Sequence, residues 1–402
     1  MNKWRLSTWG DEITLEYGKA LRSYEEGFFR VFGTNGPIGW TDTPLSDGPG
    51  VVLGRKGAYR GVHYSQEPFF VIDTAYYVVP KNSLDMRWIY YAMIHYQLGQ
   101  IDDGSPIPST TRAAVYPREL NVPNLEEQKN ISSVLSSMDE KINCNTKTAK
   151  SIEWMARTIF HSWFIDFEPV KAKVAGATSF PLMPQAIFDA LPEVFEESRI
   201  GLVPEEWAVK PITELIEINP SRSLRKNEVA PHLDMKNMPT DGHYPDKLIM
   251  RPFGSGAKFS NGDTLVARIT PCLENGKTAF VNFLNQGQVA WGSTEYIVMR
   301  PHEPIPAIFA YLLARTDEFR QFAIQSMTGT SGRQRVPFSA LSHFLIAEPP
   351  NDVLEAFGDL VNPMVERSTA SYVESRKLAE IRDYLLPRLF SGELRVATES
   401  VE

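Results

Sequence analysis

Residues 125–164 read LEEQKNISSVLSSMDEKINCNTKTAKSIEWMARTIFHSWF, and this stretch decides the fold. Its apolar side chains recur at alternating intervals of four and three residues, at Ile131, Leu135, Met138, Ile142, Ala149, Ile152, Ala156 and Ile159. One polar residue, Asn145, interrupts the stripe, and a single buried Asn can set the register of a coiled coil. With Asn124 suited to cap the N-terminus, the pattern predicts one helix about 60 Å long at 1.5 Å per residue. The alternative, a helix packed only on its own domain, is disfavoured because the stripe is narrow.

A second long helix is expected from about Asn351 to Phe390. Its apolar seam is poorer, because Ser368, Ser371 and Ser375 occupy positions that would face a partner helix. Pro363 should kink or restart this helix, since proline lacks the N–H that an interior helical residue donates. Each of the two helices leaves an apolar stripe that must be covered. Antiparallel pairing of the two is therefore the economical arrangement.

The segments in front of the two helices are similar to each other. Four matched stretches carry the repeat: Trp4–Leu6 with Trp207–Val209, Val52–Arg55 with Leu265–Arg268, Asp73–Val78 with Ser293–Val298, and Thr111–Val115 with Gly332–Val336. A period of about 200 residues is far too long for a solenoid. The repeat therefore predicts two homologous globular domains, each followed by a helical arm.

These patterns divide the chain into six segments. They are a first domain (1–124), a long helix (125–167), a connector (168–202), a second domain (203–350), a second long helix (351–392) and a tail (393–402). Shorter helices are expected at Met86–Gln97 and Gln185–Ala190, and a loop or hairpin at Gly54–Gly61. The expected fold is α+β: two homologous mixed α/β domains joined by two long antiparallel helices that form a coiled coil, with pseudo-twofold symmetry.

Composition limits the class of protein. The chain has 402 residues, of which 43% are hydrophobic, and a net charge of −8. Because the chain lacks both an apolar run of about 18 residues and an N-terminal signal core, we expect a cytoplasmic protein. Cys144 and Cys272 lie far apart and are expected to be plain thiols. Residues 1–123 and 203–349 are close to electrically neutral, so most of the negative charge lies in the helical segments and the ends.

Motifs that would carry catalysis are missing from the sequence. It has no GxxxxGK[ST] loop, no HExxH, no convincing PD…ExK pattern and no Asn-Pro-Pro-aromatic site. Gly254-Ser255-Gly256 lacks the third glycine of a dinucleotide fingerprint, and the seven histidines are scattered without ligand spacing. Together these observations favour a binding protein over an enzyme, with no catalytic residue and no metal site.

Binding would be expected on the repeated loops, where Arg, Gln and hydroxyl side chains suit phosphate oxygens and base edges. In the first domain the candidates are Arg55, Lys56, Tyr59, Arg60, Ser109, Thr110, Thr111 and Arg112. In the second domain they are Arg268, Thr270, Asn275, Lys277, Thr330, Ser331, Arg333, Gln334 and Arg335. Arg112 and Arg333 occupy matched places in the repeat, which favours phosphate contacts. The alternative is that all of these are ordinary solvated turn residues.

Three strings carry a resemblance to a known family. Residues 158–170 read TIFHSWFIDFEPV, residues 382–394 read RDYLLPRLFSGEL, and residues 200–207 read IGLVPEEW. They closely resemble the arm ends and second-domain entry of the specificity subunits of type I restriction–modification enzymes. The resemblance covers essentially the whole chain in the same order.

The resemblance implies that each domain reads one half of a bipartite DNA target and that the helices act as a ruler for the spacer. It also implies that the arms dock two methyltransferase subunits, which bind S-adenosylmethionine, and that restriction subunits, which use ATP and Mg, join them. The candidate docking residues are Phe160, Trp163, Phe164, Phe167, Leu385, Leu386, Leu389 and Phe390. The chain itself would hold no cofactor. Two alternatives are a coiled-coil scaffold with two protein-binding heads and a divergent single-chain DNA-modifying enzyme.

Overall fold

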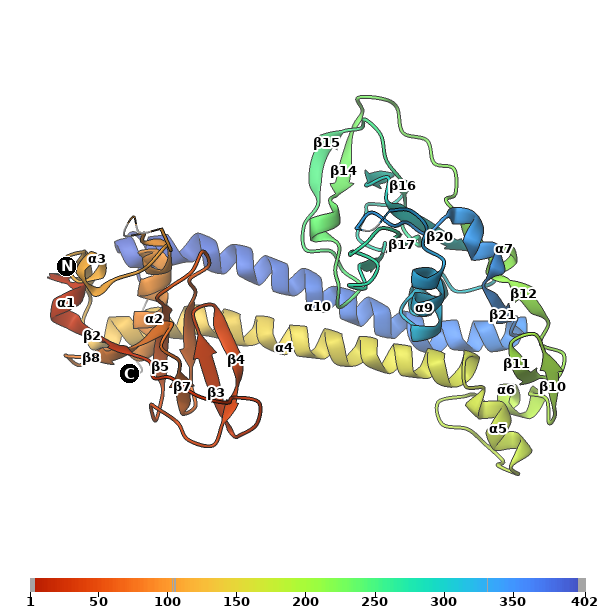
Figure 1. Ribbon diagram of the computed structural model, residues 1–402, viewed down its shortest axis with the longest axis horizontal. Helices are drawn as coiled ribbons and strands as arrows, with labels where there is room; N and C mark the ends of the chain where they lie inside the picture. Colours follow the sequence, from red (N-terminus) through yellow and green to blue (C-terminus); the bar gives the residue numbers. More distant parts are fainter. Residues whose placement is uncertain (1–3, 103, 105, 331, 397–402) are drawn as a thin grey trace, which may run out of the picture. The chain divides into compact units, whose positions relative to one another are not determined.

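The computed structural model describes residues 4–102, 104, 106–330 and 332–396 (Figure 1). The chain divides into two compact units, residues 1–143 with 375–402, and residues 144–374. Each unit contains one globular domain and a part of both long helices. Among the described residues, no helix is long and apolar enough to cross a membrane. Both cysteines are free.

The first long helix, α4 (Leu125–Phe164), begins and ends where the periodicity predicts. Asn124 Oδ1 accepts a hydrogen bond from the Glu127 backbone N–H at 2.8 Å, which caps the N-terminus. Asn145 is buried in the stripe, and its Nδ2 donates to Glu374 Oε2 at 2.8 Å. The stripe therefore faces another helix, as predicted.

That helix is α10 (Asn351–Ser391), which runs without interruption through Pro363. The expected restart is wrong, and the surroundings of Pro363 explain why. The carbonyl that loses its partner belongs to Asp359, and both residues lie on the exposed side, where water can satisfy that oxygen. On the opposite side, Phe357 and Val361 are fully buried in the core of the second unit and hold the helix in place.

The serines of α10 face α4. Ser368 and Ser371 are buried, and Ser368 Oγ donates to the Ala149 carbonyl of α4 at 3.3 Å. Small side chains at this seam let the two backbones approach closely. Within the first unit the beginning of α4 and the end of α10 share one core, and within the second unit the end of α4 and the beginning of α10 share another. The two helices are therefore antiparallel, as expected.

The first domain contains a four-stranded antiparallel sheet, a three-stranded sheet and a strand pair. In sheet order the strands are β2 (Ile13–Tyr17), β8 (Ala75–Pro80), β5 (Gly50–Gly54) and β6 (Val62–Ser65); β4 (Gly36–Thr41), β3 (Phe29–Gly33) and β7 (Phe69–Val71); and β1 (Arg5–Thr8) with β9 (Glu119–Val122). Its helices are α1 (Trp9–Glu12), α2 (Met86–His95), η1 (Leu98–Gln100) and α3 (Arg112–Val115). The helix predicted at Met86–Gln97 is thus present as α2.

The second domain has two four-stranded sheets and a strand pair. In sheet order the strands are β13 (Ile216–Ile218), β20 (Tyr296–Pro301), β17 (Thr264–Ala267) and β18 (Thr278–Phe280); β15 (Ile249–Pro252), β14 (Val229–Leu233), β19 (Ala290–Gly292) and β16 (Lys258–Phe259); and β12 (Val209–Pro211) with β21 (Leu345–Ala347). Its helices are α7 (Ile212–Leu215), η2 (Met235–Asn237), α8 (Ile308–Ala314), α9 (Asp317–Gln325) and η3 (Phe338–His343). The connector holds α5 (Glu168–Val174), the predicted α6 (Gln185–Ala190), and the hairpin of β10 (Phe195–Ser198) and β11 (Gly201–Pro204).

Strand order confirms that the domains are copies of one fold. The order β2-β8-β5-β6 matches β13-β20-β17-β18, and the parallel pair β3–β7 matches β14–β19. One detail of the predicted repeat is wrong. The Arg55 N–H donates to the Thr74 carbonyl and the Arg268 N–H donates to the Glu295 carbonyl, so Thr74 corresponds to Glu295 and the match is one residue further on.

Strand β5 shows why the central strands read as continuous apolar runs. Val51 and Leu53 belong to the core that includes α2, whereas Val52 belongs to a separate core with Phe69 of β7. Because successive side chains of a strand point to opposite faces, a strand covered on both faces is apolar at every position. The loops at the ends of these strands are thereby fixed on a rigid support.

Candidate nucleic-acid interface

The loop between β5 and β6 is the hairpin predicted at Gly54–Gly61. Lys56 and Tyr59 are exposed on it. Arg60 is turned inward: its Nε donates to Thr110 Oγ1 at 3.1 Å and its Nη2 to the Ile101 carbonyl at 2.9 Å. Arg60 therefore holds the loop against the domain and is not a free DNA contact, which corrects the prediction for this residue.

The three hydroxyl residues before Arg112 also serve the fold. Thr110 is fully buried under Arg60. Thr111 caps α3, where its Oγ1 accepts a hydrogen bond from the Ala114 N–H at 3.2 Å. Ser109 Oγ donates to the Ile107 carbonyl at 3.0 Å. The residue types expected to bind phosphate are thus engaged in capping and turn contacts instead.

Arg55 and Arg112 come together on Tyr17, a half-exposed ring at the end of β2. The guanidinium carbons lie 5.1 and 4.4 Å from the ring centroid, a distance at which cations and aromatic rings attract each other. Carbonyl oxygens orient both groups, since Arg55 donates to Asp73 at 2.9 Å and Arg112 to Leu15 at 2.7 Å. Both arginines remain partly exposed. This patch is the part of the predicted first-domain site that the structure brings together.

The second domain has a different arrangement. Arg268 lies 3.9 Å from the centroid of the Phe338 ring. Burial lowers the pKa of Arg268, and the nearby Glu295 carboxylate opposes that effect. Arg335 binds both oxygens of Glu295, at 2.9 and 3.0 Å. The positive charge of Arg335 is therefore balanced within the domain.

Other predicted residues of the second domain are divided between support and surface. Lys277 Nζ donates to the carbonyls of Met235 and Lys236 at 2.5 and 3.3 Å, so it braces the domain. Thr270 Oγ1 accepts from the Gln334 N–H at 3.2 Å and joins two loops. The exposed members are Asn275, Thr330 and Arg333, while Ser331 lies outside the described residues.

Arg112 and Arg333 do not occupy matched positions. Thr110 N–H donates to the Arg55 carbonyl, and Val336 N–H donates to the Arg268 carbonyl, each at 2.9 Å. Thr110 therefore corresponds to Val336, and Arg112, two residues later, corresponds to Phe338. The sequence match failed because the loops before these residues differ in length between the domains.

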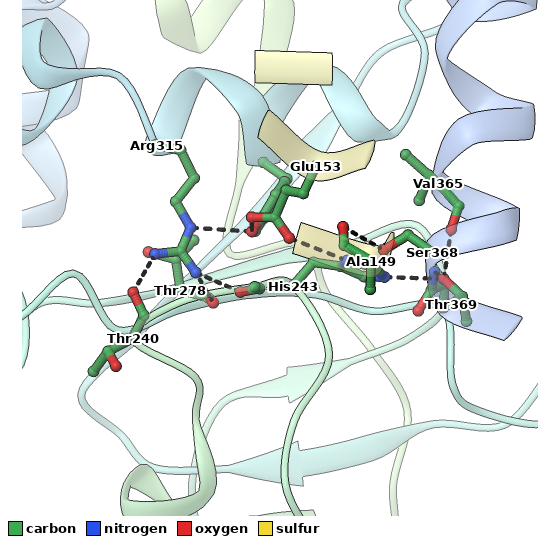
Figure 2. A network of polar contacts seen from close by, with 12 residues as sticks. Ala149, Glu153, Thr240, His243, Thr278, Arg315, Val365, Ser368 and Thr369 are labelled. Atoms are coloured by element: carbon green, nitrogen blue, oxygen red, sulfur yellow. Dashed lines mark hydrogen bonds and ion pairs between the residues drawn. The ribbon is translucent and has the colours of Figure 1, made fainter. Parts of the chain in front are cut away.

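Buried polar contacts attach the second domain to both long helices, and sequence reasoning missed them (Figure 2). Tyr311 of α8 donates to Glu153 of α4. His243 lies between Glu153 Oε2, 3.5 Å from Nδ1, and Thr369 Oγ1 of α10, 2.9 Å from Nε2. Burial would raise the pKa of Glu153, but the contacts of its carboxylate with His243 and Tyr311 outweigh that effect and hold the pKa below its ordinary value.

Arg315 completes this cluster. Its side chain is buried, and its Nε donates to Tyr311 Oη at 3.1 Å. Its Nη atoms donate to the carbonyls of Thr240 at 2.8 Å and Thr278 at 3.0 Å (Figure 2). Arg315 thereby fixes the loop that carries His243 against the sheet.

The first domain is attached by a related but more open contact. Tyr91 of α2 donates to Asp139 Oδ2 of α4 at 2.6 Å. Arg382 of α10 donates to Asp139 Oδ1, also at 2.6 Å. Burial and the Asp139 carboxylate both raise the pKa of Tyr91, which therefore stays protonated and donates. In both units a tyrosine of the domain binds a carboxylate of α4.

Six of the eight docking residues expected from the arm ends are buried, which corrects the prediction for those six. Phe160, Trp163, Phe164 and Phe167 lie in the core of the second unit, and Leu389 and Phe390 in that of the first. Leu385 and Leu386 pack against the first core and stay partly exposed. The large apolar side chains that the helices do expose are Trp154, Met155, Ile381 and Tyr384.

Among the described residues, no group of three or more His, Cys, Asp or Glu side chains could hold a metal ion. The arrangement instead offers arginines, exposed loop side chains and aromatic rings on two rigid supports. Such groups bind phosphate oxygens and base edges.

Comparisons with known proteins agree with this geometry. The family model described as "Type I restriction modification DNA specificity domain" matches residues 8–154. The HindI specificity subunit of Haemophilus influenzae is 24% identical over 337 residues, covering 71% of this chain and 71% of that protein. The MjaIX specificity subunit of Methanocaldococcus jannaschii is 24% identical over 339 residues, covering 79% of this chain and 71% of the relative. The EcoAI specificity subunit of Escherichia coli is 30% identical over 166 residues, covering 40% of this chain and 28% of the relative.

A solved structure shares the fold. The S subunit of a type I restriction–modification system from M. genitalium aligns with a TM-score of 0.63 at 14% identity, over 96% of each chain.

Proposed function

Because this chain belongs to the specificity subunits of type I restriction–modification enzymes, we propose that it reads a bipartite DNA target with one half-site for each domain. The observation that carries the proposal is the same fold occurring twice with different loop surfaces. The first domain presents Tyr17 flanked by Arg55 and Arg112, whereas the second presents Arg268 on Phe338 beside Glu295. Two domains that share a fold but present chemically different surfaces suit two different short DNA sequences.

We propose further that α4 and α10 set the length of the spacer between the half-sites. Both helices contribute to both units, and each domain binds side chains of both helices. In the first unit Asp139 of α4 binds Tyr91, and Phe390 of α10 stacks on Trp88. In the second unit Glu153 of α4 binds Tyr311, and Thr369 of α10 binds His243. A domain held to the helices in this way must follow any change in their length.

The chain would act as a non-catalytic scaffold in the complex. In this proposal two methyltransferase subunits carry S-adenosylmethionine and the adenine chemistry, and restriction subunits use ATP and Mg. The exposed side chains Trp154, Met155, Ile381 and Tyr384 are better docking candidates than the buried aromatic residues of the arm ends. Aromatic residues and Met are enriched at protein–protein interfaces, which supports this choice.

Exchange of one domain tests the proposal. Residues 4–124 would be replaced by the first domain of another specificity subunit, and methylated adenines would be mapped by sequencing DNA from cells that also express the methyltransferase subunits. One half of the motif should change while the other half and the spacer stay the same. If both halves changed, the domains would not be independent readers. The purified chain without its partners should methylate no DNA.

Lengthening the helices tests the ruler. Four residues inserted after Asn145, with a matching insertion next to Glu374, would add about 6 Å at 1.5 Å per residue. This is close to two base-pair steps of about 3.4 Å. The spacer should lengthen by one or two base pairs with both half-sites retained. An active complex with the original spacer would refute the ruler.

A further inference from the structure

Exposed basic side chains of the second domain gather on one hairpin, in a stretch that also holds the acidic residues Glu228, Asp234, Asp241 and Asp246. Residues 203–349 contain equal numbers of basic and acidic residues. Many of the basic side chains are engaged internally, as Arg315, Lys277 and Arg335 are. In contrast, Arg225, Lys226, Lys247 and Arg251 are all exposed, and they lie in β15 or in the segments that flank β14 and β15. Among the described residues, the first three have no ion-pair partner, and Arg251 has only Asp234, at 3.8 Å.

This basic hairpin is the edge of its sheet. β15 is the outer strand of the order β15-β14-β19-β16 (Figure 1). Its Met250, Arg251 and Pro252 are exposed. The Asn227 N–H donates to the Phe253 carbonyl at 2.9 Å and closes the open end of the hairpin. The loop with Arg225 and Lys226 is thereby held at the end of the two strands.

The same hairpin exposes large apolar side chains. Met250 is 61% and Val229 is 59% exposed. Apolar side chains beside unpaired cations are poorly suited to water alone, and clustered exposed apolar surface marks interaction sites. A surface that offers both apolar contact and positive charge fits a partner that has stacked bases and negatively charged phosphates.

The first domain carries a related hairpin at the corresponding place. β4 is the edge strand of the order β4-β3-β7, and Ile38 of β4 and Phe28 just before β3 are exposed. The Arg30 guanidinium of β3 lies 3.8 Å from the centroid of the Trp40 ring. In the second domain Arg251 lies 5.9 Å from the Trp291 ring. Both copies thus have an edge hairpin with exposed apolar residues and an arginine near a tryptophan, although the tryptophan belongs to the hairpin only in the first domain.

We propose that these edge hairpins, β14–β15 and β3–β4, enter the major groove of duplex DNA; this rests on the function proposed above. The major groove admits a two-stranded β-ribbon. On β14–β15, Arg225 and Lys226 contact phosphates and position the ribbon, because they lie at its open end. Arg251 meets base edges by hydrogen bonds. Met250, its neighbour in β15, points to the opposite face of the ribbon and packs against the sugar–phosphate backbone.

Single substitutions in the assembled methyltransferase complex test this assignment. Arg251→Ala should relax one position of one half-site in the methylation motif, whereas Met250→Ala should weaken binding without changing the motif. For Arg251→Ala, discrimination at that position should fall about 5- to 150-fold, the equivalent of 1–3 kcal/mol for a bidentate base contact. The double variant Arg225→Ala/Lys226→Ala should keep the motif, weaken binding to all sequences and lower the salt slope by about two units.

Matched controls are available on the β10–β11 hairpin of the connector. Leu202 is 61% exposed, as Met250 is, and Arg199 is exposed. Leu202→Ala and Arg199→Ala should leave both the motif and the affinity unchanged. All of these side chains lie on the surface, so thermal unfolding should match that of the parent chain and rule out a folding defect.

Two results would overturn the inference. One is an unchanged motif and affinity in both Met250→Ala and Arg251→Ala. The other is loss of complex assembly with the motif retained, which would assign the hairpin to a protein partner. The domain exchange separates this inference from the proposed function: if exchange changes a half-site and the hairpin variants do not, only the hairpin assignment fails.

Discussion

The two domains share one fold but are attached to the long helices by contacts of different character. In the first unit the carboxylate is Asp139, whose side chain is 23% exposed and whose partner Arg382 also binds the exposed Asp383. In the second unit it is Glu153, which is 9% exposed and surrounded by Tyr311 and His243. The comparison shows that two copies of one fold can keep the same contact between a tyrosine and a carboxylate. The burial of this contact differs between the copies, and its contribution to stability should therefore differ as well.

Removal of the buried carboxylate should have the largest effect. Glu153→Ala leaves Tyr311 and His243 without their carboxylate partner in a largely buried site, and removing one partner of a buried ion pair costs about 3–5 kcal/mol. Protection from hydrogen exchange should fall in α8 and in the loop that holds His243. The amides of α2 in the first unit serve as the internal control. Unchanged protection in α8 would show that the contact with Glu153 does not stabilise this helix.

The same change in the first unit should cost less. Asp139→Ala leaves Arg382 bound to Asp383 and partly solvated, so the expected loss is about 1–3 kcal/mol, the cost of a polar group that loses its partner. Hydrogen exchange at α2 and denaturant unfolding provide the measurement. A loss as large as that of Glu153→Ala would mean that burial does not determine how much the contacts at Asp139 and Glu153 contribute to stability.

Acidification should weaken the contact of the second domain with Glu153 of α4. The pKa of Glu153 lies below its ordinary value of 4.5, so the stability that its ionised form contributes is fully present above about pH 4.5. It is lost as the pH falls through the lower pKa of the folded state. The difference in unfolding free energy between the parent chain and Glu153→Gln should therefore be constant near neutral pH and shrink below pH 4.5. A difference that grows on acidification would contradict the assigned direction.

The smallest effect is expected for an ion pair that links the same loop to α4. Lys150 Nζ lies 2.7 Å from Asp241 Oδ2, and both side chains are more than half exposed. Exposed pairs contribute about 0–1 kcal/mol. Lys150→Ala should therefore leave the midpoint of denaturant unfolding nearly unchanged, and high salt should remove what difference remains. A loss comparable to that of Glu153→Ala would mean that the exposed pair of Lys150 and Asp241 holds the loop to α4 as strongly as Glu153 does.

Local patterns in the sequence determined the elements of this protein. The apolar period from Ile131 to Ile159 predicts the long helix α4, because a helix that packs along one narrow stripe repeats its contacts every three or four positions. The repeat predicts two copies of one domain, and Asn145 in the stripe predicts a buried polar contact between helices. The helix and the buried Asn145 need only near neighbours along the chain, and the repeat needs only a comparison of short matched stretches.

Tertiary structure alone decided which side chains are available to a partner. Arg60 and Lys277 are residue types that often contact DNA, yet carbonyl oxygens distant in sequence hold both side chains against the domain. Phe160 and Phe164 occupy the arm end that the resemblance assigns to docking, but their rings pack on Phe309 of the second domain. Residue type and spacing indicate what a side chain can bind. Only the folded chain determines whether other groups of the same protein already contact that side chain.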